Sequence, residues 1–442
     1  FAGRLPRLVV IATLVLQAAS CAGAQGPVGP AAGPADWVLV GGDVRTMDPA
    51  MPRASALAIR GDRIVAVGDD AAVADLIGPS TQVVRLGGHT VTPGLIDAHC
   101  HLASLGRALE SASLRGVTSE REAARQIAAW AATAPAAPAP DDWVIGRGWD
   151  QNLFDPPEFP RRQSLDAVIA DRPVALRRID GHAVWVNSAA LARAGISAAT
   201  KDPAGGRIER DAAGEPTGVL VDNAMDLIAV PDPGPEILER QILAAAQVAV
   251  AAGITGIHEM GIDDATVAVY RGLASEGRLP LRIYAFLSGS AASARTLRDR
   301  APDVSGGEAW FTLRGVKFFA DGALGSRGAA LAAPYDDDPG NRGLWLTSPA
   351  ELTGQVADAV AGGWQVAIHA IGDAAVGAVV DAFQAALAQR PGADLRLRIE
   401  HTQVITDADI GRMASLGIIA SMQPTHATSD MPWAEARLGP QR

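Results

Sequence analysis

The sequence has little cysteine, no excess of basic residues and no long apolar run. Its two cysteines, Cys21 and Cys100, exclude an internal disulfide framework, because the first lies in an N-terminal segment of export type. Lys and Arg number 38 against 49 Asp and Glu, a net charge of −11, so no basic surface for nucleic acid is expected. No apolar segment reaches the roughly 20 residues that span a bilayer. Apolar residues are abundant. They make up 48% of the 442 residues, which is enough to form the cores of one large domain and a smaller one.

The N-terminus has the layout of an export signal over residues 1–24. Basic residues precede the apolar run Leu8–Ala19, and small residues follow it. Cys21 resembles the cysteine that is lipidated in bacterial lipoproteins, and ordinary cleavage after Ala24 is the alternative. We therefore expect an exported protein, either periplasmic or tethered to a membrane through Cys21, and otherwise secreted. The Pro-, Gly- and Ala-rich residues 25–35 are predicted to be a linker.

Two architectures follow along the chain. Residues 36–90 contain short strand-like segments separated by turn residues, which predicts a small β-sandwich. In residues 91–442, apolar strands alternate with Ala-rich helical stretches, which predicts an α/β fold, a (β/α)8 TIM-type barrel with its eighth strand missing. The seven predicted strands are Leu95–Asp97, Thr255–His258, Arg282–Leu287, Gly315–Phe319, Val366–His369, Leu397–His401 and Ile418–Met422.

An insertion, residues 103–252, separates the first two barrel strands. Its predicted parts are a helix, a Pro/Ala-rich loop, one strand, a turn-rich stretch and a returning helix: Glu120–Ala132, Pro135–Pro140, Pro173–Leu176, Asp202–Gly218 and Glu236–Ala252.

The stretch Val91–Leu102, VTPGLIDAHCHL, carries the first chemical signal. His99 and His101 are two positions apart, so on a strand their imidazoles project from one face. Two such imidazoles suit two bonds to one divalent metal. The alternative is a pair of structural histidines in a hairpin.

Further candidates end other predicted strands. His258, Lys317, His369 and His401 each lie at or near a strand end. The carboxyl ends of the strands carry the active site in such barrels. One histidine there is usually structural, and we interpret His258 in that way, but several in succession predict a shared metal site.

Longer motifs accompany these positions. They are Pro-Gly-Leu-Ile-Asp-Ala-His-Cys-His (93–101), Gly-Arg-Gly-Trp-Asp (146–150), Asp-Gly-His (180–182), Asp-Gly-Ala-Leu-Gly-Ser-Arg (321–327), His-Ala-Ile-Gly-Asp (369–373), Arg-Ile-Glu-His (398–401) and Gln-Pro-Thr-His (423–426). In this order the chain resembles the metal-dependent amidohydrolase superfamily. Within it, the chain is similar to amidohydrolase family 3, the branch that includes N-substituted formamide deformylases, from about Trp37 to Arg442.

The resemblance implies a ligand set. His99 and His101 would be first-strand metal ligands, and His369 and His401 the ligands of the fifth and sixth strands. Lys317 would be a carboxylated lysine that bridges two metals. An unmodified lysine is protonated at neutral pH and is a poor ligand, so the role depends on the carbamate. A salt-bridged lysine is the alternative. Lys317 and His369 are the expected catalytic positions.

Other positions are expected around the substrate. Trp149 and Asp150 would wall the pocket from the insertion. His182 is interpreted as a pocket residue, with loop packing as the alternative. Asp321 and Arg327 would grip substrate from a polar loop, unless that loop is merely solvated. His426 would line the pocket.

The expected reaction follows from the metal. One or two divalent ions, expected to be zinc, would lower the pKa of bound water from about 15.7 to about 7 and polarise the scissile carbonyl. The sequence thus predicts a hydrolase of non-peptide carbon–nitrogen bonds in a small amide, formamide or cyclic amide. The resemblance also implies a general-base aspartate in a Gly-Ser-Asp sequence on the eighth strand. None occurs, so we expect a C-terminally incomplete fragment.

Two other function classes are alternatives to this hydrolase. A glycoside hydrolase barrel needs paired carboxylates at its strand ends, where this chain has imidazoles. A degenerate lipoprotein that binds a small molecule in the same barrel without turnover is the remaining alternative. The substrate, the metal count and any homo-oligomer stay open.

Overall fold

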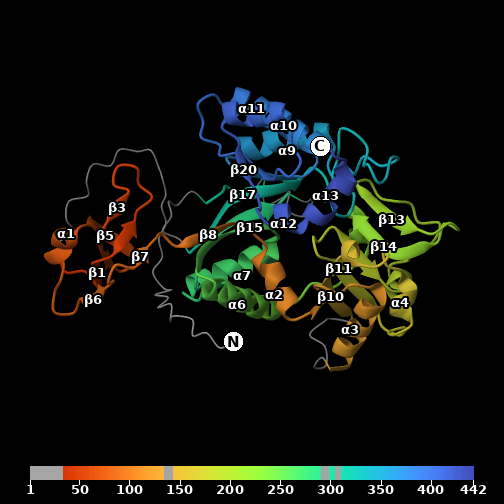
Figure 1. Ribbon diagram of the computed structural model, residues 1–442, viewed down its shortest axis with the longest axis horizontal. Helices are drawn as coiled ribbons and strands as arrows, with labels where there is room; N and C mark the ends of the chain where they lie inside the picture. The colour runs from red at the N-terminus through yellow and green to blue at the C-terminus, as the bar shows by residue number, and fades with distance from the viewer. Residues whose placement is uncertain (1–32, 134–142, 290–296, 298, 304–309) are drawn as a thin grey trace.

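A computed structural model describes residues 33–133, 143–289, 297, 299–303 and 310–442 (Figure 1). The export segment 1–24 and the loop Pro135–Pro140 lie outside the described residues, so those two predictions are untested. Over the described ranges, no helix combines the length and the apolar character that crossing a membrane would need.

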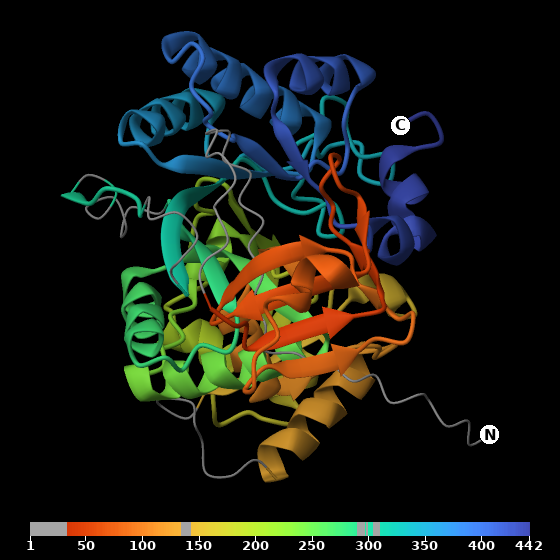
Figure 2. The ribbon, with the colours of Figure 1, turned by 90° about the vertical axis from the view of Figure 1, so that its left-hand side faces the viewer.

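The N-terminal domain consists of two small sheets. The first has the order β5-β4-β1-β6 (Arg63–Gly68, Ala56–Arg60, Trp37–Val40, Gln82–Arg85), and the second the order β3-β2-β7 (Arg53–Ala54, Asp43–Arg45, Thr90–Val91). A short helix, α1 (Asp70–Ala74), covers the first sheet. Apolar side chains from both sheets meet in one cluster. The domain lies beside the barrel in Figure 1 and in front of it in Figure 2. This confirms the predicted N-terminal sheet domain.

Seven parallel strands form a nearly closed barrel. Their order is β8-β15-β16-β17-β18-β19-β20 (Leu95–Cys100, Ile254–Ile262, Arg282–Ser288, Phe311–Phe319, Gln365–Ala370, Arg398–His401, Ile419–Ser421). Barrel strands that follow one another along the chain are also neighbours in the sheet, as expected for a barrel of βα units. Each predicted barrel strand is present, and the TIM-type fold is confirmed.

Helices cover the outside of the barrel. They are α6 (Pro235–Ala251), α7 (Asp264–Ser275), α9 (Pro349–Ala361), α10 (Asp373–Gln389) and α11 (Asp407–Leu416). Their apolar faces and the outer faces of the strands form the largest hydrophobic core. The start of α9 is fixed by a capping box between Ser348 and Glu351. Two short helices, α12 (His426–Ser429) and α13 (Met431–Leu438), follow the last described strand.

The insertion contains a sheet of its own, larger than the sequence predicted. The order is β13-β14-β12-β11-β10-β9 (Gly206–Arg210, Pro216–Asp222, Ala183–Val186, Val174–Arg178, Val144–Trp149, Ala112–Ser113). Helices α3 (Glu120–Thr133), α4 (Arg162–Asp166) and α5 (Ser188–Arg193) pack around it. The prediction that Asp202–Gly218 is only a turn-rich stretch was wrong, because it contains β13 and the start of β14. Its glycines and aspartates mark the ends of a hairpin whose strands are short.

Helices α2 (Leu102–Leu109) and α6 join the insertion to the barrel. Arg240 on α6 makes two hydrogen bonds, of 2.8 and 3.1 Å, to the carboxylate of Glu110, just after α2. The helices touch at Gly106, where a Cβ atom would lie 2.2 Å from the carbonyl oxygen of Gln241. Only glycine allows this approach. Because His101 is the residue before α2, the contact also positions a predicted metal ligand.

Candidate active site at the carboxyl ends of the barrel strands

The predicted metal-ligating histidines come together in the structure. The ring centroids of His99 and His101 are 5.2 Å apart, those of His99 and His401 4.7 Å, and those of His369 and His401 4.7 Å. They come from β8, from the residue before α2, and from β18 and β19. Parallel strands end at one rim of a barrel, which is why residues 302 positions apart in sequence (401 − 99) meet.

The donor set fits a divalent metal, although the side chains are not already gathered around one point. No three His, Cys, Asp or Glu side chains of the described residues stand in metal-binding geometry as they are. Imidazole suits zinc and related ions. Burial, followed by the neighbouring cations, lowers the pKa of His369 and His401 well below the usual range. These rings are therefore neutral at pH 7, the form that binds metal.

The pKa of His101 is also lowered, although this residue is more exposed than His369 and His401. More than a third of the residue is exposed to the cavity described below. Even so, the protein atoms around the ring, and then the Lys317 ammonium, lower the pKa of His101 to about 3.

A buried carboxylate orients His99. Glu400 is fully buried, and its Oε2 lies 2.6 Å from His99 Nδ1. Arg398 donates two hydrogen bonds to the same carboxylate, of 2.5 and 3.0 Å. Burial alone would raise the pKa of Glu400, but the hydrogen bonds from His99 and Arg398 lower it further than burial raises it. The carboxylate stays ionised, and Nε2 is left as the free ring nitrogen of His99. His401 is held in a similar way, since its Nδ1 lies 2.6 Å from Gln423 Oε1.

Lys317 is the strongest evidence that these residues fit a metal site. Its side chain is 1% exposed, and its Nζ has no hydrogen-bond partner among the described residues. Nζ lies over the ring of Phe319, 4.5 Å from its centroid. Burial lowers the pKa of Lys317 from 10.5 to about 8, although Glu400 opposes the shift. A buried amine without a partner, easily deprotonated, is well suited to become a carbamate.

Asp321 holds two loops and does not face substrate. It is fully buried and accepts backbone N–H bonds from Ala330, Ile371 and Gly372, of 2.8, 3.0 and 2.8 Å. Burial raises the pKa of Asp321 to about 7, against the effect of these three donors. Its Oδ1 lies 3.6 Å from His369 Nε2. The structure therefore gives Asp321 a positioning role beside a predicted ligand, in place of the substrate contact expected from sequence.

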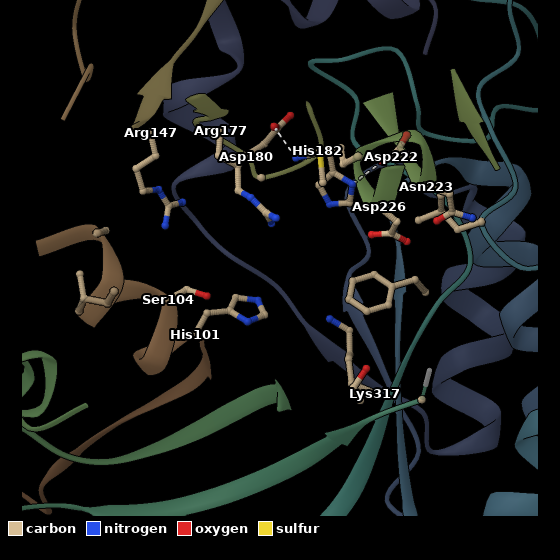
Figure 3. Close-up of a pocket in the computed structure, with 18 of the residues that line it drawn as sticks. His101, Ser104, Arg147, Arg177, Asp180, His182, Asp222, Asn223, Asp226 and Lys317 are labelled. Carbon is tan, nitrogen blue, oxygen red and sulfur yellow. Dashed lines mark hydrogen bonds and ion pairs between the residues drawn. The ribbon is translucent and has the colours of Figure 1, made fainter. Parts of the chain in front are cut away.

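A cavity of about 900 Å³ opens beside His101, at the edge of the histidine cluster. His101 and Lys317 line it from the barrel, and His182, Asp180 and Asp222 line it from the insertion (Figure 3). The cavity is thus formed between the two parts of the molecule. His182, interpreted from sequence as a pocket residue, lies on its wall.

His182 is held by a carboxylate and faces the cluster. Its Nδ1 lies 2.7 Å from Asp222 Oδ1, and its ring centroid lies 4.9 Å from that of His369. Burial alone would lower the pKa of His182, but the hydrogen bond and the charge of Asp222 raise it above its ordinary value.

The structure does not bring Trp149 or Asp150 into the cavity. Trp149 is fully buried in the core of the insertion, and its Nε1 donates to the carbonyl of Leu176 at 2.7 Å. Asp150 caps the turn at Asn152 and accepts a 2.6 Å bond from Arg178. A large aromatic side chain fits a core as well as a pocket wall, and here the core contains it.

Arg327 and His426 complete the predicted set. Arg327 forms an ion pair of 2.9 Å with Asp337 and does not line the cavity, so it is placed in a loop contact and not at substrate. His426 is half-buried at the start of α12, with its ring centroid 5.8 Å from that of His401. It lies at the edge of the cluster.

Three buried residues of the site had no role predicted from sequence. Arg398 on β19 contacts three other strands, because it donates to Ala98 and Ser421 and lies 2.8 Å from His258 Nδ1. This contact gives His258, which lies within β15, the packing role predicted for it.

Glu259 and Glu400 are the other two. The carboxylate of Glu259 accepts the N–H groups of Leu102 and Ala103, of 2.5 and 3.1 Å, directly after His101. The available signal was a charged residue inside an apolar strand, since such residues are rarely buried without a partner.

The fold is a parallel βα barrel, and the imidazoles at the carboxyl ends of its strands are donors that fit a divalent metal. The comparisons with known proteins name the family. The model of the amidohydrolase family matches residues 82–442, and the chain belongs to this family. It is an amidohydrolase, and its family implies a divalent metal.

Several relatives show how widely the similarity extends. The chain is 35% identical to protein LONG AFTER FAR-RED 3 of Arabidopsis thaliana, over 92% of this chain and 71% of that protein. It is 35% identical to putative amidohydrolase YtcJ of Bacillus subtilis, over 82% and 68%. It is 30% identical to N-substituted formamide deformylase of Arthrobacter pascens, over 87% and 72%. The crystal structure of an uncharacterized metal-dependent hydrolase from Pyrococcus furiosus superposes with a TM-score of 0.68 at 27% identity, covering 92% of this chain and 80% of that one.

Proposed function

We propose that this protein hydrolyses a carbon–nitrogen bond, other than a peptide bond, in a small amide, with zinc as its metal. The observation that carries the proposal is the buried, unpartnered amine of Lys317 beside four clustered imidazoles. The similarity to a relative named N-substituted formamide deformylase makes a formamide the first substrate to test.

The residues of the site have separate proposed roles. His99, His101, His369 and His401 would hold the metal together with the carbamate of Lys317. When bound, a divalent metal supplies a more acidic water and polarises the scissile carbonyl. Glu400 and Gln423 hold Nδ1 of His99 and of His401, which leaves Nε2 of each ring as the nitrogen that would bind the metal.

His182 is the proposed proton donor. It lines the cavity, and Asp222 keeps its ring protonated to a higher pH than an isolated imidazole. A proton on this ring can pass to the leaving nitrogen, or a hydrogen bond from it can hold the carbonyl oxygen of the substrate.

The test measures the carbamate and the bound zinc separately from substrate turnover. The chain has only two lysines, Lys201 and Lys317, so incubation with ¹³C-bicarbonate and zinc should give one protected carbamate signal by NMR. Mass spectrometry should find one or two equivalents of zinc. N-benzylformamide should then be hydrolysed to formate and benzylamine.

Lys201→Met is the matched control, because Lys201 is exposed. This variant should keep the carbamate signal, the zinc and the activity, and Lys317→Met should lose all three. Folded parent protein that takes up no zinc would contradict the proposal. So would a carbamate signal that survives in Lys317→Met.

A further inference from the structure

A row of polar side chains crosses the insertion sheet where it faces the cavity. Ser113 on β9 pairs in register with Arg147 on β10, and Arg147 pairs with Arg177 on β11. Register partners on neighbouring strands share one face of a sheet. All three residues line the cavity, and Figure 3 shows both guanidinium groups pointing into it, across from His101 and Lys317.

The two arginines lack the partners that such side chains usually have. Within the described part of the chain, no carboxylate pairs with Arg147 or Arg177, and the Nε atom of Arg147 is buried without a hydrogen bond. Like charges directly opposite each other on neighbouring strands destabilise a sheet. Burial first, and then other guanidinium groups, lowers the pKa of both side chains.

Three carboxylates lie near this row, and two of them are engaged by other side chains. Asp180 forms a 2.5 Å ion pair with Arg178, and Asp222 lies against His182. The third, Asp226, lines the cavity and acts on Arg177 through its charge, but forms no ion pair of 4 Å or less with it. The contrast with Arg178, one residue after Arg177, is informative. Arg178 points into the protein and is 2% exposed, with Asp150 and Asp180 as partners. Arg178 has the contacts of a structural arginine, and Arg177 does not.

We infer that the row formed by Ser113, Arg147 and Arg177 binds a carboxylate of the substrate. Two guanidinium groups on one face present several N–H donors to a planar anion, and each guanidinium can bind a carboxylate through two parallel hydrogen bonds. Ser113 adds a hydroxyl donor. The inference rests on the proposed function and narrows it: the substrate is a small amide whose far end carries a carboxylate. That end lies on the insertion wall, and the scissile bond lies over the histidine cluster.

The experiment measures binding without turnover. In the first probe, 4-(3-oxobutyl)benzoate, a methylene replaces the amide nitrogen, so the molecule cannot be hydrolysed. The second probe, 1-(3-oxobutyl)-4-nitrobenzene, has an uncharged group of the same shape in place of the carboxylate. Calorimetry on the zinc-loaded full chain should give an affinity at least about tenfold higher for the carboxylate, as expected for hydrogen bonds between charged groups.

Variants test whether the row of Ser113, Arg147 and Arg177 causes the preference for the carboxylate probe. Arg147→Gln/Arg177→Gln should bind both probes equally, with its affinity for the nitro compound unchanged, which shows that the pocket is still folded. Arg147→Lys keeps the charge and should keep part of the preference. Arg125→Gln, on the exposed face of α3, should behave as the parent. A parent that binds both probes equally would overturn the inference, as would a double variant that keeps the preference.

A parallel assay separates this inference from the proposed reaction. It follows hydrolysis of 4-(formamidomethyl)benzoate and of its nitro counterpart. If the carboxylate ketone binds preferentially and neither formamide is hydrolysed, the proposed reaction is wrong and the anion site stands. If both formamides are hydrolysed at equal kcat/KM and both ketones bind equally, the reaction stands and the anion site is wrong.

Discussion

At the scale of single residues, the site depends on side chains whose burial is matched to their chemistry. Of the 38 basic side chains, only Lys201 and Lys317 are lysines. An arginine at 317 could serve in an ion pair, but its guanidinium stays protonated and cannot become a carbamate. The one buried lysine therefore has the amine with a lowered pKa that the proposed carbamate requires.

Glu259 provides a prediction on pH. Burial raises the pKa of this carboxyl from 4.5 to about 7. Because the folded-state pKa lies above the unfolded one, the protonated form stabilises the fold below about pH 4.5. That contribution is lost as pH rises through 7. We expect the free energy of unfolding of the parent, relative to Glu259→Gln, to fall by about 3 kcal/mol between pH 4.5 and 8.

Denaturation of both proteins at several pH values measures this difference. Glu236→Gln, at the exposed start of α6, controls for the loss of one negative charge. A constant difference between the parent and Glu259→Gln at all pH values would show that this carboxyl does not titrate as the structure indicates.

At the scale of elements, the contact between α2 and α6 sets the position of His101. A methyl group on Gly106 would meet the backbone of Gln241 at 2.2 Å, so one helix must move. We expect Gly106→Ala to cost about 1–3 kcal/mol of stability, the usual range for overpacking. The same change should weaken zinc binding, because His101 directly precedes α2.

Gly272 in α7 is the matched control. A Cβ atom there has open space, and alanine favours a helix over glycine by up to about 1 kcal/mol. Gly272→Ala should therefore raise the thermal midpoint, and Gly106→Ala should lower it. Equal effects of the two changes would mean that the helix contact does not constrain α2.

At the scale of the whole molecule, the cavity belongs to neither part alone. The barrel contributes Lys317 and, from the histidine cluster, His101, and the insertion contributes His182, Arg147 and Arg177. A bound metal would stabilise only the folded arrangement. Removing zinc with a chelator should therefore lower the thermal midpoint, in line with about 2.7 kcal/mol at a free zinc concentration one hundred times Kd.

Differential scanning calorimetry with and without the chelator measures this loss. Lys317→Met should show a much smaller change, because one ligand of the site is absent. A midpoint that does not respond to the chelator in the parent would contradict a site built from these residues.

Much of the fold is determined locally. Short apolar runs separated by Ala-rich helices specify parallel strands, and β15 to β20 fall within a few residues of the predicted positions. Because parallel strands end at the same rim, His99, His369 and His401 had to meet once the barrel formed. The histidine cluster was therefore predictable from the chain order of its members.

The tertiary structure alone decided what each polar side chain faces. Trp149 could fill a core or a pocket wall on sequence grounds, and its burial depends on Trp185 and Leu176, which lie further along the chain. The roles of Glu400 and Arg398 depend on contacts across the barrel. The pairing of Arg147 with Arg177 depends on the register between two strands about 30 residues apart. Burial and register are set by residues distant in sequence, so no local pattern could specify them.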